Sequence, residues 1–348
     1  MFSGEILSLR ANFLVDSSIA RAAPARDGFR EDQASMRLFV GVTDWDWWSL
    51  HATKTAVEEV NFWRPSSTAN FQALAPGEIF LFKLHTPRNA IAGGGFFTKF
   101  LSLPVSLAWE AFGEGNGARS LAEVRQRISF YRRAPIEAME DPNIGCILLE
   151  EPFFFAEPDW IPTPPDFSLN IVSGKGYDTS EHARQLLWQQ VGERLQAIRI
   201  GAGNLGPALA AAADAARYGS PLVVLPRLGQ GSFRVLVTDA CARRCAVSGE
   251  RTLPVLQAAH IKPYADGGEH QLSNGILLRS DLHTLFDKGY LGIDPTAMRI
   301  LVSSRIREQF ENLREYYSLE GRTLRLPGDP AAVPAYENLA YHAEKVFH

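Results

Sequence analysis

Short apolar runs separated by turn residues fill much of residues 1–150, and they predict a mixed α+β region. Leu38–Val42 (LFVGV) and Ile79–Leu84 (IFLFKL) have the length and composition of strands. Leu121–Tyr131 (LAEVRQRISFY) has apolar residues at helical spacing, which predicts a helix. A further strand is expected at Gly145–Leu149.

Residues 151–217 are expected to connect two folded domains. Glu151–Pro165 (EPFFFAEPDWIPTPP) is too rich in proline for regular structure, which indicates a semi-rigid linker. The amphipathic pattern of Ser180–Ile198 predicts a helix capped by Ser180 or Thr179, which either mediates dimerisation or braces the domains. The alanine-rich segment Gly206–Arg217 is either a weak helix or flexible.

Residues 218–348 are expected to form the last domain. Arg234–Val237 is either a strand or the end of a helix, because so short a run does not separate the two. An apolar stretch then ends at His260, and a second short strand is expected at Ile276–Leu278. Ser280–Lys288 (SDLHTLFDK) predicts a helix with Ser280 as its N-cap. The order is strand, polar loop, strand, helix.

Three polar side chains occupy fixed places in this pattern. His260 ends the first strand, Asn274 precedes the second, and His283 lies within the helix. Phosphodiester hydrolysis needs a base that activates water and a cation that neutralises charge on the phosphate. A histidine titrates near neutral pH and suits the base, an amide can orient it, and a neutral imidazole can bind a divalent metal.

The string AAHIKPY…NGILLRSDLHTLFDKGYLGID, together with these three residues, resembles the HNH (ββα-metal) endonuclease family. The resemblance covers roughly residues 218–348. It implies that His260 is the general base, that Asn274 positions it and that His283 binds the metal. The expected cofactor is Mg²⁺, with Mn²⁺ or another divalent ion as the alternative. The expected partner is double-stranded DNA.

One position departs from the family pattern. Many members carry an aspartate ligand directly before the first histidine, where this chain has Ala259. Asp287, one turn after His283, or Asn274 itself could complete the metal shell, although Asp287 could instead cap the helix or pair near Lys288. Lys262 and Arg279 are candidate phosphate contacts, with solvated surface residues as the alternative, and His270 is expected to be a loop residue.

The aromatic clusters near the N-terminus resemble a second family. Thr43–Trp48 (TDWDWW), Asn61–Pro65 (NFWRP) and Gly93–Phe97 (GGGFF) occur in the order found in PUA-like domains of the EVE type. The resemblance covers about residues 38–133 and implies a small β-barrel with an aromatic pocket for a modified base. The candidate pocket residues are Trp45, Trp47, Trp48, Trp63 and Asp44, with Asp46 as a further polar contact. The alternative is that these tryptophans are core residues, with Trp45 and Trp47 on one face of a strand.

Composition narrows the class of protein. The chain has 348 residues, of which 46% are hydrophobic and 21% charged, as in soluble two-domain proteins. No apolar run is long enough to span a membrane, and the first residues lack a secretory pattern, so a cytoplasmic protein is expected. The odd count of three cysteines argues against a disulfide framework, and without a second Cys pair no structural zinc site is expected. The net charge of −4 neither requires nor excludes DNA, although the C-terminal region is mildly basic.

These patterns favour an α+β, modification-dependent restriction endonuclease. A PUA-like domain would flip out 5-methylcytosine or 5-hydroxymethylcytosine, and an HNH domain would cut nearby. Because one HNH site cuts one strand, a homodimer is expected. Two alternatives remain. One is a nuclease whose N-terminal domain reads RNA or unmodified sequence; the other is an inactive nucleic-acid reader, which Ala259 would favour.

Overall fold

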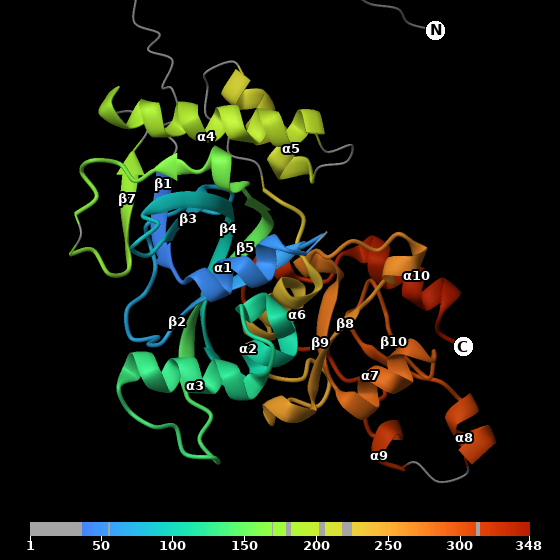
Figure 1. The fold of residues 1–348 in the computed structure, drawn as a ribbon. Coiled ribbons are helices and arrows are strands. Elements are labelled where there is room, and N and C mark those ends of the chain that lie inside the picture. Colours follow the sequence, from blue (N-terminus) through green and yellow to red (C-terminus); the bar gives the residue numbers. More distant parts are fainter. Residues whose placement is uncertain are drawn as a thin grey trace, which may run out of the picture. The chain divides into compact units, whose positions relative to one another are not determined.

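The N-terminal half of the chain is built on one mixed β-sheet (Figure 1). This computed structural model describes residues 37–54, 56–168, 170–178, 182–201, 206–217, 225–310 and 314–348. The strands of the sheet are β1 (Arg37–Thr43), β2 (Glu59–Arg64), β3 (Ile79–Leu84), β4 (Ala90–Pro104), β5 (Asn143–Phe154), β6 (Ile161–Pro162) and β7 (Gly174–Asp178). The strands expected at Leu38–Val42, Ile79–Leu84 and Gly145–Leu149 are confirmed.

The sheet is open along its described strands. Its order is β2-β5-β4-β3-β1-β7, and β6 pairs with β4. Strands β1 and β3 are parallel and the remaining neighbours are antiparallel. The outer strands β2 and β7 do not pair with each other, so the closed barrel expected from the PUA-like resemblance is not formed by the described residues. Strand β4 pairs with three strands, because β6 pairs with its first residues, Ala90 and Ile91, and β5 pairs from Gly93 onwards.

Helices cover both faces of the sheet because its strands alternate apolar residues between two cores. The helices of this half are α1 (Trp45–Ala52), α2 (Val105–Phe112), α3 (Leu121–Arg132), α4 (His182–Gly201) and α5 (Pro207–Arg217). Ile79 and Leu81 pack in one buried cluster with α4 and α5. Phe80 and Phe82 pack in the opposite cluster with Trp47 of α1. The helix expected at Leu121–Tyr131 is confirmed as α3.

The segment expected to be a linker contributes to this sheet. Strand β5 continues to Phe154 despite Pro152, and β7 pairs antiparallel with β1. The Glu151 carboxylate accepts hydrogen bonds from the backbone N–H groups of Ala208 (3.3 Å) and Leu209 (2.9 Å) at the start of α5. The helix expected at Ser180–Ile198 corresponds to α4, which packs on the sheet. Its proposed caps, Thr179 and Ser180, lie outside the described residues.

The tryptophan-rich segment is a helix, so the alternative in which Trp45 and Trp47 share one face of a strand is wrong. The N–H of Trp48 donates to the Asp44 carbonyl (3.1 Å), which is an i to i−4 helical hydrogen bond. Trp47, Trp48 and His51 are buried, a spacing that matches one side of a helix.

The C-terminal half contains two short hairpins surrounded by helices. Its elements are α6 (Gln230–Ala240), β8 (Leu256–His260), β9 (Gly275–Arg279), α7 (Ser280–Asp287), β10 (Leu291–Ile293), β11 (Ile300–Val302), α8 (Arg305–Phe310), α9 (Arg314–Tyr317) and α10 (Tyr336–Lys345). Strands β8 and β9 pair antiparallel, with His260 opposite Gly275, and α7 follows directly. The expected strand, loop, strand, helix order is confirmed, although the N-cap position is Arg279 and Ser280 is the first helical residue.

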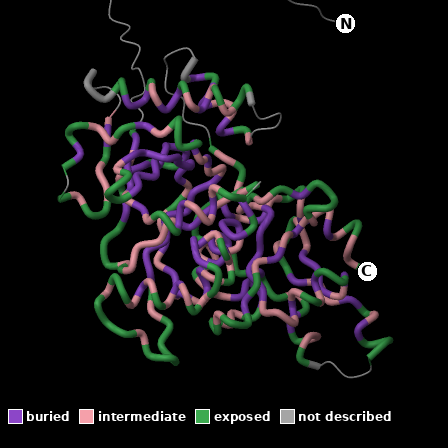
Figure 2. Tube along the Cα trace, viewed as in Figure 1, coloured by how far each residue is buried: buried purple, intermediate pink, exposed green. Residues whose placement is uncertain are grey.

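Helix α6 contacts both halves of the chain, and the described residues belong to one compact unit. Phe233 and Val237 pack with β8, β9 and α7, whereas Val235 and Leu236 pack with residues of α2, β4 and β5. The Glu59 carboxylate of β2 accepts hydrogen bonds from the backbone N–H groups of Gly231 (2.6 Å) and Ser232 (2.7 Å). Figure 2 shows buried residues running through the sheet and on into the C-terminal elements.

None of the described helices is both long and apolar enough to cross a bilayer.

Candidate active site

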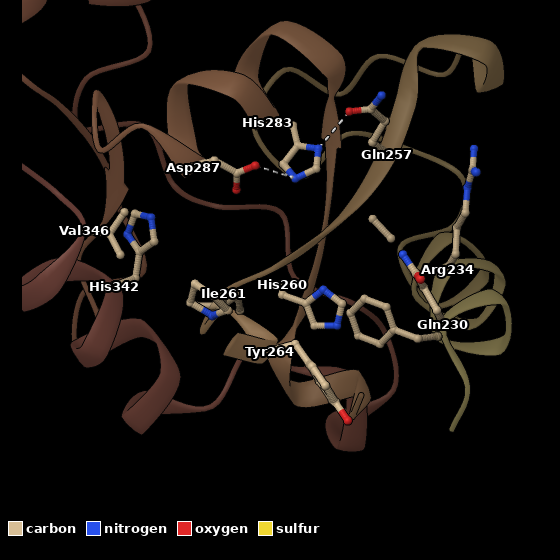
Figure 3. A pocket seen from close by; sticks show the side chains of 13 residues that line it. Gln230, Arg234, Gln257, His260, Ile261, Tyr264, His283, Asp287, His342 and Val346 are labelled. Atoms are coloured by element: carbon tan, nitrogen blue, oxygen red, sulfur yellow. Dashed lines mark hydrogen bonds and ion pairs between the residues drawn. The ribbon is translucent and has the colours of Figure 1, made fainter. Parts of the chain in front are cut away.

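A cleft of about 550 Å³ opens between α6, the β8–β9 hairpin, α7 and α10 (Figure 3). It brings together His260, His283 and Asp287, which are candidates from the sequence. The remaining lining residues are Gln230, Phe233, Arg234, Gln257, Ala258, Ile261, Pro263, Tyr264, His342 and Val346.

His260 is held in one orientation as the last residue of β8. Its ring stacks on Phe233, with centroids 4.1 Å apart and planes 12° from parallel. Its Nε2 is buried and has no hydrogen-bond partner among the described residues, so Nδ1 is the nitrogen available to a water molecule. Burial, followed by repulsion from His270 and His283, lowers the pKa of His260 to about 4. The imidazole is therefore neutral at neutral pH and can accept a proton.

Asn274 is buried beneath this site, at 2% exposure. Its side-chain oxygen accepts from the Lys262 N–H (2.8 Å), and its amide nitrogen donates to the carbonyls of Lys262 and Glu269 (3.0 Å each). The Asn274 carbonyl also accepts from the Ile261 N–H (2.9 Å). Asn274 therefore fixes the loop that follows His260 and does not contact the imidazole through its side chain. Its side chain is buried and does not line the cleft, so it does not reach the place where His283 and Asp287 would hold a metal.

His283 lies between two polar partners on the opposite wall of the cleft. Its Nδ1 is 2.8 Å from Gln257 Oε1, and its Nε2 is 3.2 Å from Asp287 Oδ2. A carboxamide oxygen only accepts hydrogen bonds, so Nδ1 carries the ring proton. In the neutral ring, Nε2 then presents a lone pair to the lone pairs of the Asp287 carboxylate. Two acceptors this close need a proton or a cation between them.

This donor set fits a hard divalent cation. One imidazole and one carboxylate leave room for water and phosphate oxygens, which is how Mg²⁺ is usually held. Burial raises the pKa of Asp287, and the charge of His283 opposes that shift. Among the described residues no group of three or more His, Cys, Asp or Glu side chains could hold a metal. Cys241 and Cys245 are free thiols in that part of the chain, and they form no zinc site with other described residues.

The two basic residues predicted to contact phosphate have other contacts. The Arg279 guanidinium binds both oxygens of Asp281 (2.6 and 2.8 Å) and also reaches Glu315 (3.1 Å). Two carboxylates therefore neutralise its charge. The Lys262 Nζ lies 5.1 Å from the centre of the Tyr341 ring, which places its charge over an aromatic face.

Two residues near the base were not recognised from the sequence as part of the site. His270 is a loop residue, as expected, and its ring lies 5.0 Å from that of His260 while its Nδ1 is 3.0 Å from the Leu228 carbonyl. Phe233 comes from α6, outside the HNH-like string. No local motif marks either residue, because both are placed by packing between distant segments.

The residues proposed for the base pocket differ in how far their side chains are exposed. Trp47 and Trp48 are 4% and 8% exposed, and Trp48 Nε1 donates to the Ala92 carbonyl (2.9 Å). Trp63 Nε1 donates to the Asn116 carbonyl (2.9 Å). The selection of Trp47 and Trp48 as pocket residues is wrong, because both side chains are packed in the core. Trp63 is half-buried, and its ring centroid lies 6.2 Å from that of Tyr131.

Asp44 and Trp45 instead line a second hollow of about 520 Å³. The other residues around it are Asp46, Glu123, Gln126, Arg127, Phe130 and Tyr131. Trp45 is 38% exposed, but its ring lies between Trp48 (centroids 5.1 Å apart) and the Arg88 guanidinium (3.7 Å from the ring centre).

Comparison with known proteins assigns the segment that contains the β8–β9 hairpin and α7 to a known family. Residues 245–294 match the family model described as HNH endonuclease. The C-terminal region therefore contains an HNH endonuclease domain. This HNH domain spans β8, β9 and α7 and includes His260, Asn274, His283 and Asp287. It implies a nuclease, a hydrolase that binds nucleic acid, and such nucleases generally use a divalent metal.

The other comparisons add no function. No curated protein matches the chain. A crystal structure of a mutant of the ZmASCH protein from Zymomonas mobilis matches with a TM-score of 0.28 and 10% identity, over 43% of this chain and 94% of that one. A TM-score of that size does not establish a shared fold.

Proposed function

We propose that the protein is a metal-dependent endonuclease that hydrolyses phosphodiester bonds in DNA. The convergence of His260, His283 and Asp287 on one cleft inside the HNH domain carries this proposal. The lowered pKa of His260 keeps that imidazole neutral, and the facing lone pairs of His283 and Asp287 provide a place for a cation.

Each residue has a distinct task in the proposed reaction. His260 Nδ1 accepts a proton from the attacking water, while Phe233 holds the ring in place. Asn274 fixes the loop after His260 through backbone hydrogen bonds. His283 and Asp287 hold Mg²⁺ or a similar divalent ion, with Gln257 orienting His283. When bound, the ion neutralises charge on the phosphate and the leaving oxygen.

The nuclease proposal is tested by incubating supercoiled plasmid with the wild-type protein in Mg²⁺, in Mn²⁺ and in EDTA. We expect nicked or linear plasmid with a divalent metal and intact plasmid in EDTA. A protein that shifts the plasmid in a gel without cutting it in either metal would support the inactive reader instead.

We further propose that the N-terminal region directs cleavage to DNA carrying 5-methylcytosine or 5-hydroxymethylcytosine, and that the active form is a homodimer. The hollow beside α1 and α3 supports the first part. Phe130 and Tyr131 are 76% and 43% exposed there, next to Asp44 and Asp46. Exposed rings can stack on a flipped base, and carboxylates accept hydrogen bonds from the amino group of cytosine.

Matched DNA substrates test the modification dependence. Two plasmids of identical sequence, one containing 5-methylcytosine, are digested with the wild-type protein and with Phe130→Ala. We expect preferential cutting of the modified plasmid by the wild type and loss of that preference in the variant. Phe310→Ala, which alters another exposed phenylalanine, is the control. Equal cutting of both plasmids by the wild type would leave a nuclease without modification dependence.

A further inference from the structure

A third hollow, lined by three long cationic side chains, adjoins the catalytic cleft. It has a volume of about 470 Å³ and is lined by Asp287, Lys288, Tyr290, Arg305, Lys345, Val346 and His348. Asp287 and Val346 line the catalytic cleft as well, so the two hollows share a wall. Figure 3 shows this shared side, with Asp287 between His283 and Val346.

The three long cations of this hollow are not neutralised within the described part of the chain. Neither Lys288, Arg305 nor Lys345 forms an ion pair with a described carboxylate, and the only carboxylate among the lining side chains, Asp287, pairs with His283. Arg279 differs, since Asp281 and Glu315 bind it. Lys288 and Lys345 lie at the C-terminal ends of α7 and α10, where the helix dipole stabilises a cation. Arg305 is the first residue of α8, and the dipole of that helix does not stabilise a cation at its N-terminal end.

Backbone contacts hold the three segments together. The N–H of Ser303 donates to the Tyr290 carbonyl (3.0 Å), and the N–H of His348 donates to the Gly289 carbonyl (3.0 Å). Gly289 has a φ of +71°, and a Cβ there would lie 2.0 Å from the Val346 carbonyl oxygen. Glycine at this position therefore lets the end of α10 approach the turn after α7, which gathers the cations around one hollow.

We propose that Lys288, Arg305 and Lys345 form a binding site for DNA backbone phosphates next to the scissile phosphate. The inference rests on the proposed nuclease function, because it takes the cleft at His283 and Asp287 as the place of cutting. Cations around an open hollow that form no ion pair with a described carboxylate fit an extended polyanion, since each can displace a counterion from one phosphate. The site positions the strand across the metal-binding residues and is independent of base sequence.

The experiment measures binding and cleavage separately. Affinity for a fluorescent duplex is followed by anisotropy in EDTA over a range of salt concentrations, and plasmid nicking is followed in Mg²⁺. The test protein is Lys288→Gln/Arg305→Gln/Lys345→Gln. The control is Arg251→Gln/Arg299→Gln/Arg322→Gln, which removes the same charge from exposed arginines that line neither hollow. Circular dichroism and melting temperature confirm that both variants fold.

We expect the test variant to bind duplex about 10-fold or more weakly at moderate salt, with the slope of log K against log salt reduced by about 2 to 3. The control should keep the wild-type slope within about 1. Single substitutions should each reduce the slope by about 1, which separates lost phosphate contacts from a change in fold.

The outcomes distinguish the two proposals. If the wild type cuts plasmid but the test variant binds and cuts like the control, the phosphate site is wrong and the nuclease proposal stands. If the test variant alone loses binding but the wild type never cuts, these cations still bind DNA phosphates, while the nuclease proposal and the place of the site beside a scissile phosphate both fail. A wild type that neither binds nor cuts DNA overturns both.

Discussion

At the scale of single residues, the chemistry of the site depends on partners that lie outside the recognisable motif. His283 is useful to a metal only if its Nε2 is unprotonated, and Gln257 on β8 enforces this by accepting from Nδ1 at 2.8 Å. His260 is a neutral base because Phe233 and its surroundings enclose it.

Replacing Gln257 tests the metal site without altering a ligand. Gln257→Leu should weaken Mn²⁺ binding by about 10- to 100-fold, because His283 is then free to carry its proton on Nε2. Isothermal titration calorimetry measures the affinity, and the Mn²⁺ concentration for half-maximal nicking gives an independent value.

Two matched variants complete that experiment. Gln257→Glu keeps the accepting oxygen and should retain most of the affinity, whereas Gln189→Leu on α4 should change nothing. Wild-type affinity in Gln257→Leu would show that His283 does not bind the ion through Nε2.

The motif residues could be predicted from the sequence because their spacing is local. His260, Asn274 and His283 follow one another along a hairpin and its helix, so the chain order fixes their elements. Their contacts could not be predicted in the same way. Asn274 was expected to orient the imidazole but holds the backbone at Lys262 and Glu269 instead, which depends on how the loop folds back.

At the scale of elements, buried carboxylates join α6 to the sheet. Glu59 and Glu150 accept hydrogen bonds from backbone N–H groups at the start of that helix, and Glu150 Oε2 is 2.9 Å from the Gly229 nitrogen. Burial, followed by repulsion from Glu59, raises the pKa of Glu150 from 4.5 to about 8. Burial also raises the pKa of Glu59.

This arrangement predicts that stability falls as the pH rises. Below about pH 4.5 Glu150 is protonated in both the folded and unfolded states. As the pH rises towards 8, the folded state keeps a proton that the unfolded state has lost, so folding becomes less favourable. Glu150→Gln removes this titration and keeps an acceptor for Gly229. Between about pH 5 and pH 9 the Tm of the wild type should fall by about 4 °C or more relative to the variant.

Differential scanning fluorimetry at several pH values makes the measurement. Glu157→Gln, which changes an exposed carboxylate, should follow the wild type. Parallel Tm profiles for the wild type and Glu150→Gln would mean that the pKa of the Glu150 carboxyl is not raised in the folded state.

Elements with strong local patterns were predicted, and those set by tertiary packing were not. The regular spacing of apolar residues identified α3 and the strand that became β3. The proline-rich segment was expected to be irregular, yet its first residues extend β5 because β4 supplies hydrogen-bond partners there. The alternative considered for Trp45 and Trp47 placed them on one face of a strand, although the buried positions of Trp47, Trp48 and His51 have a helical spacing.

At the scale of the whole molecule, α6 packs against both the HNH domain and the sheet, and this links the stability of the HNH domain to that of the sheet. Its two sides pack in different buried clusters, with Phe233 towards the hairpin and Leu236 towards α2 and β5. The sequence placed a domain boundary before residue 218, and composition alone could not reveal a helix shared by both cores.

Leu236→Ala tests this coupling. It should destabilise the protein by about 2–5 kcal/mol, the usual cost of truncating a buried leucine. All seven tryptophans lie at or before Trp188, so tryptophan fluorescence reports the sheet and its helices, while nicking activity reports the HNH domain. Both signals should be lost at the same, lower temperature. Loss of activity with an unchanged fluorescence transition would show that the two halves unfold separately.

The most direct test of the whole account is the rate of Mg²⁺-dependent plasmid nicking by His260→Ala, measured beside the wild type and Arg279→Ala. Removing the base should slow nicking by about 10²- to 10⁴-fold without changing the affinity for DNA in EDTA. Arg279→Ala, whose guanidinium is bound by Asp281 and Glu315, should keep a rate within about threefold of the wild type once its folding is confirmed. A His260→Ala protein that nicks plasmid at the wild-type rate would contradict the assignment of this cleft as the active site.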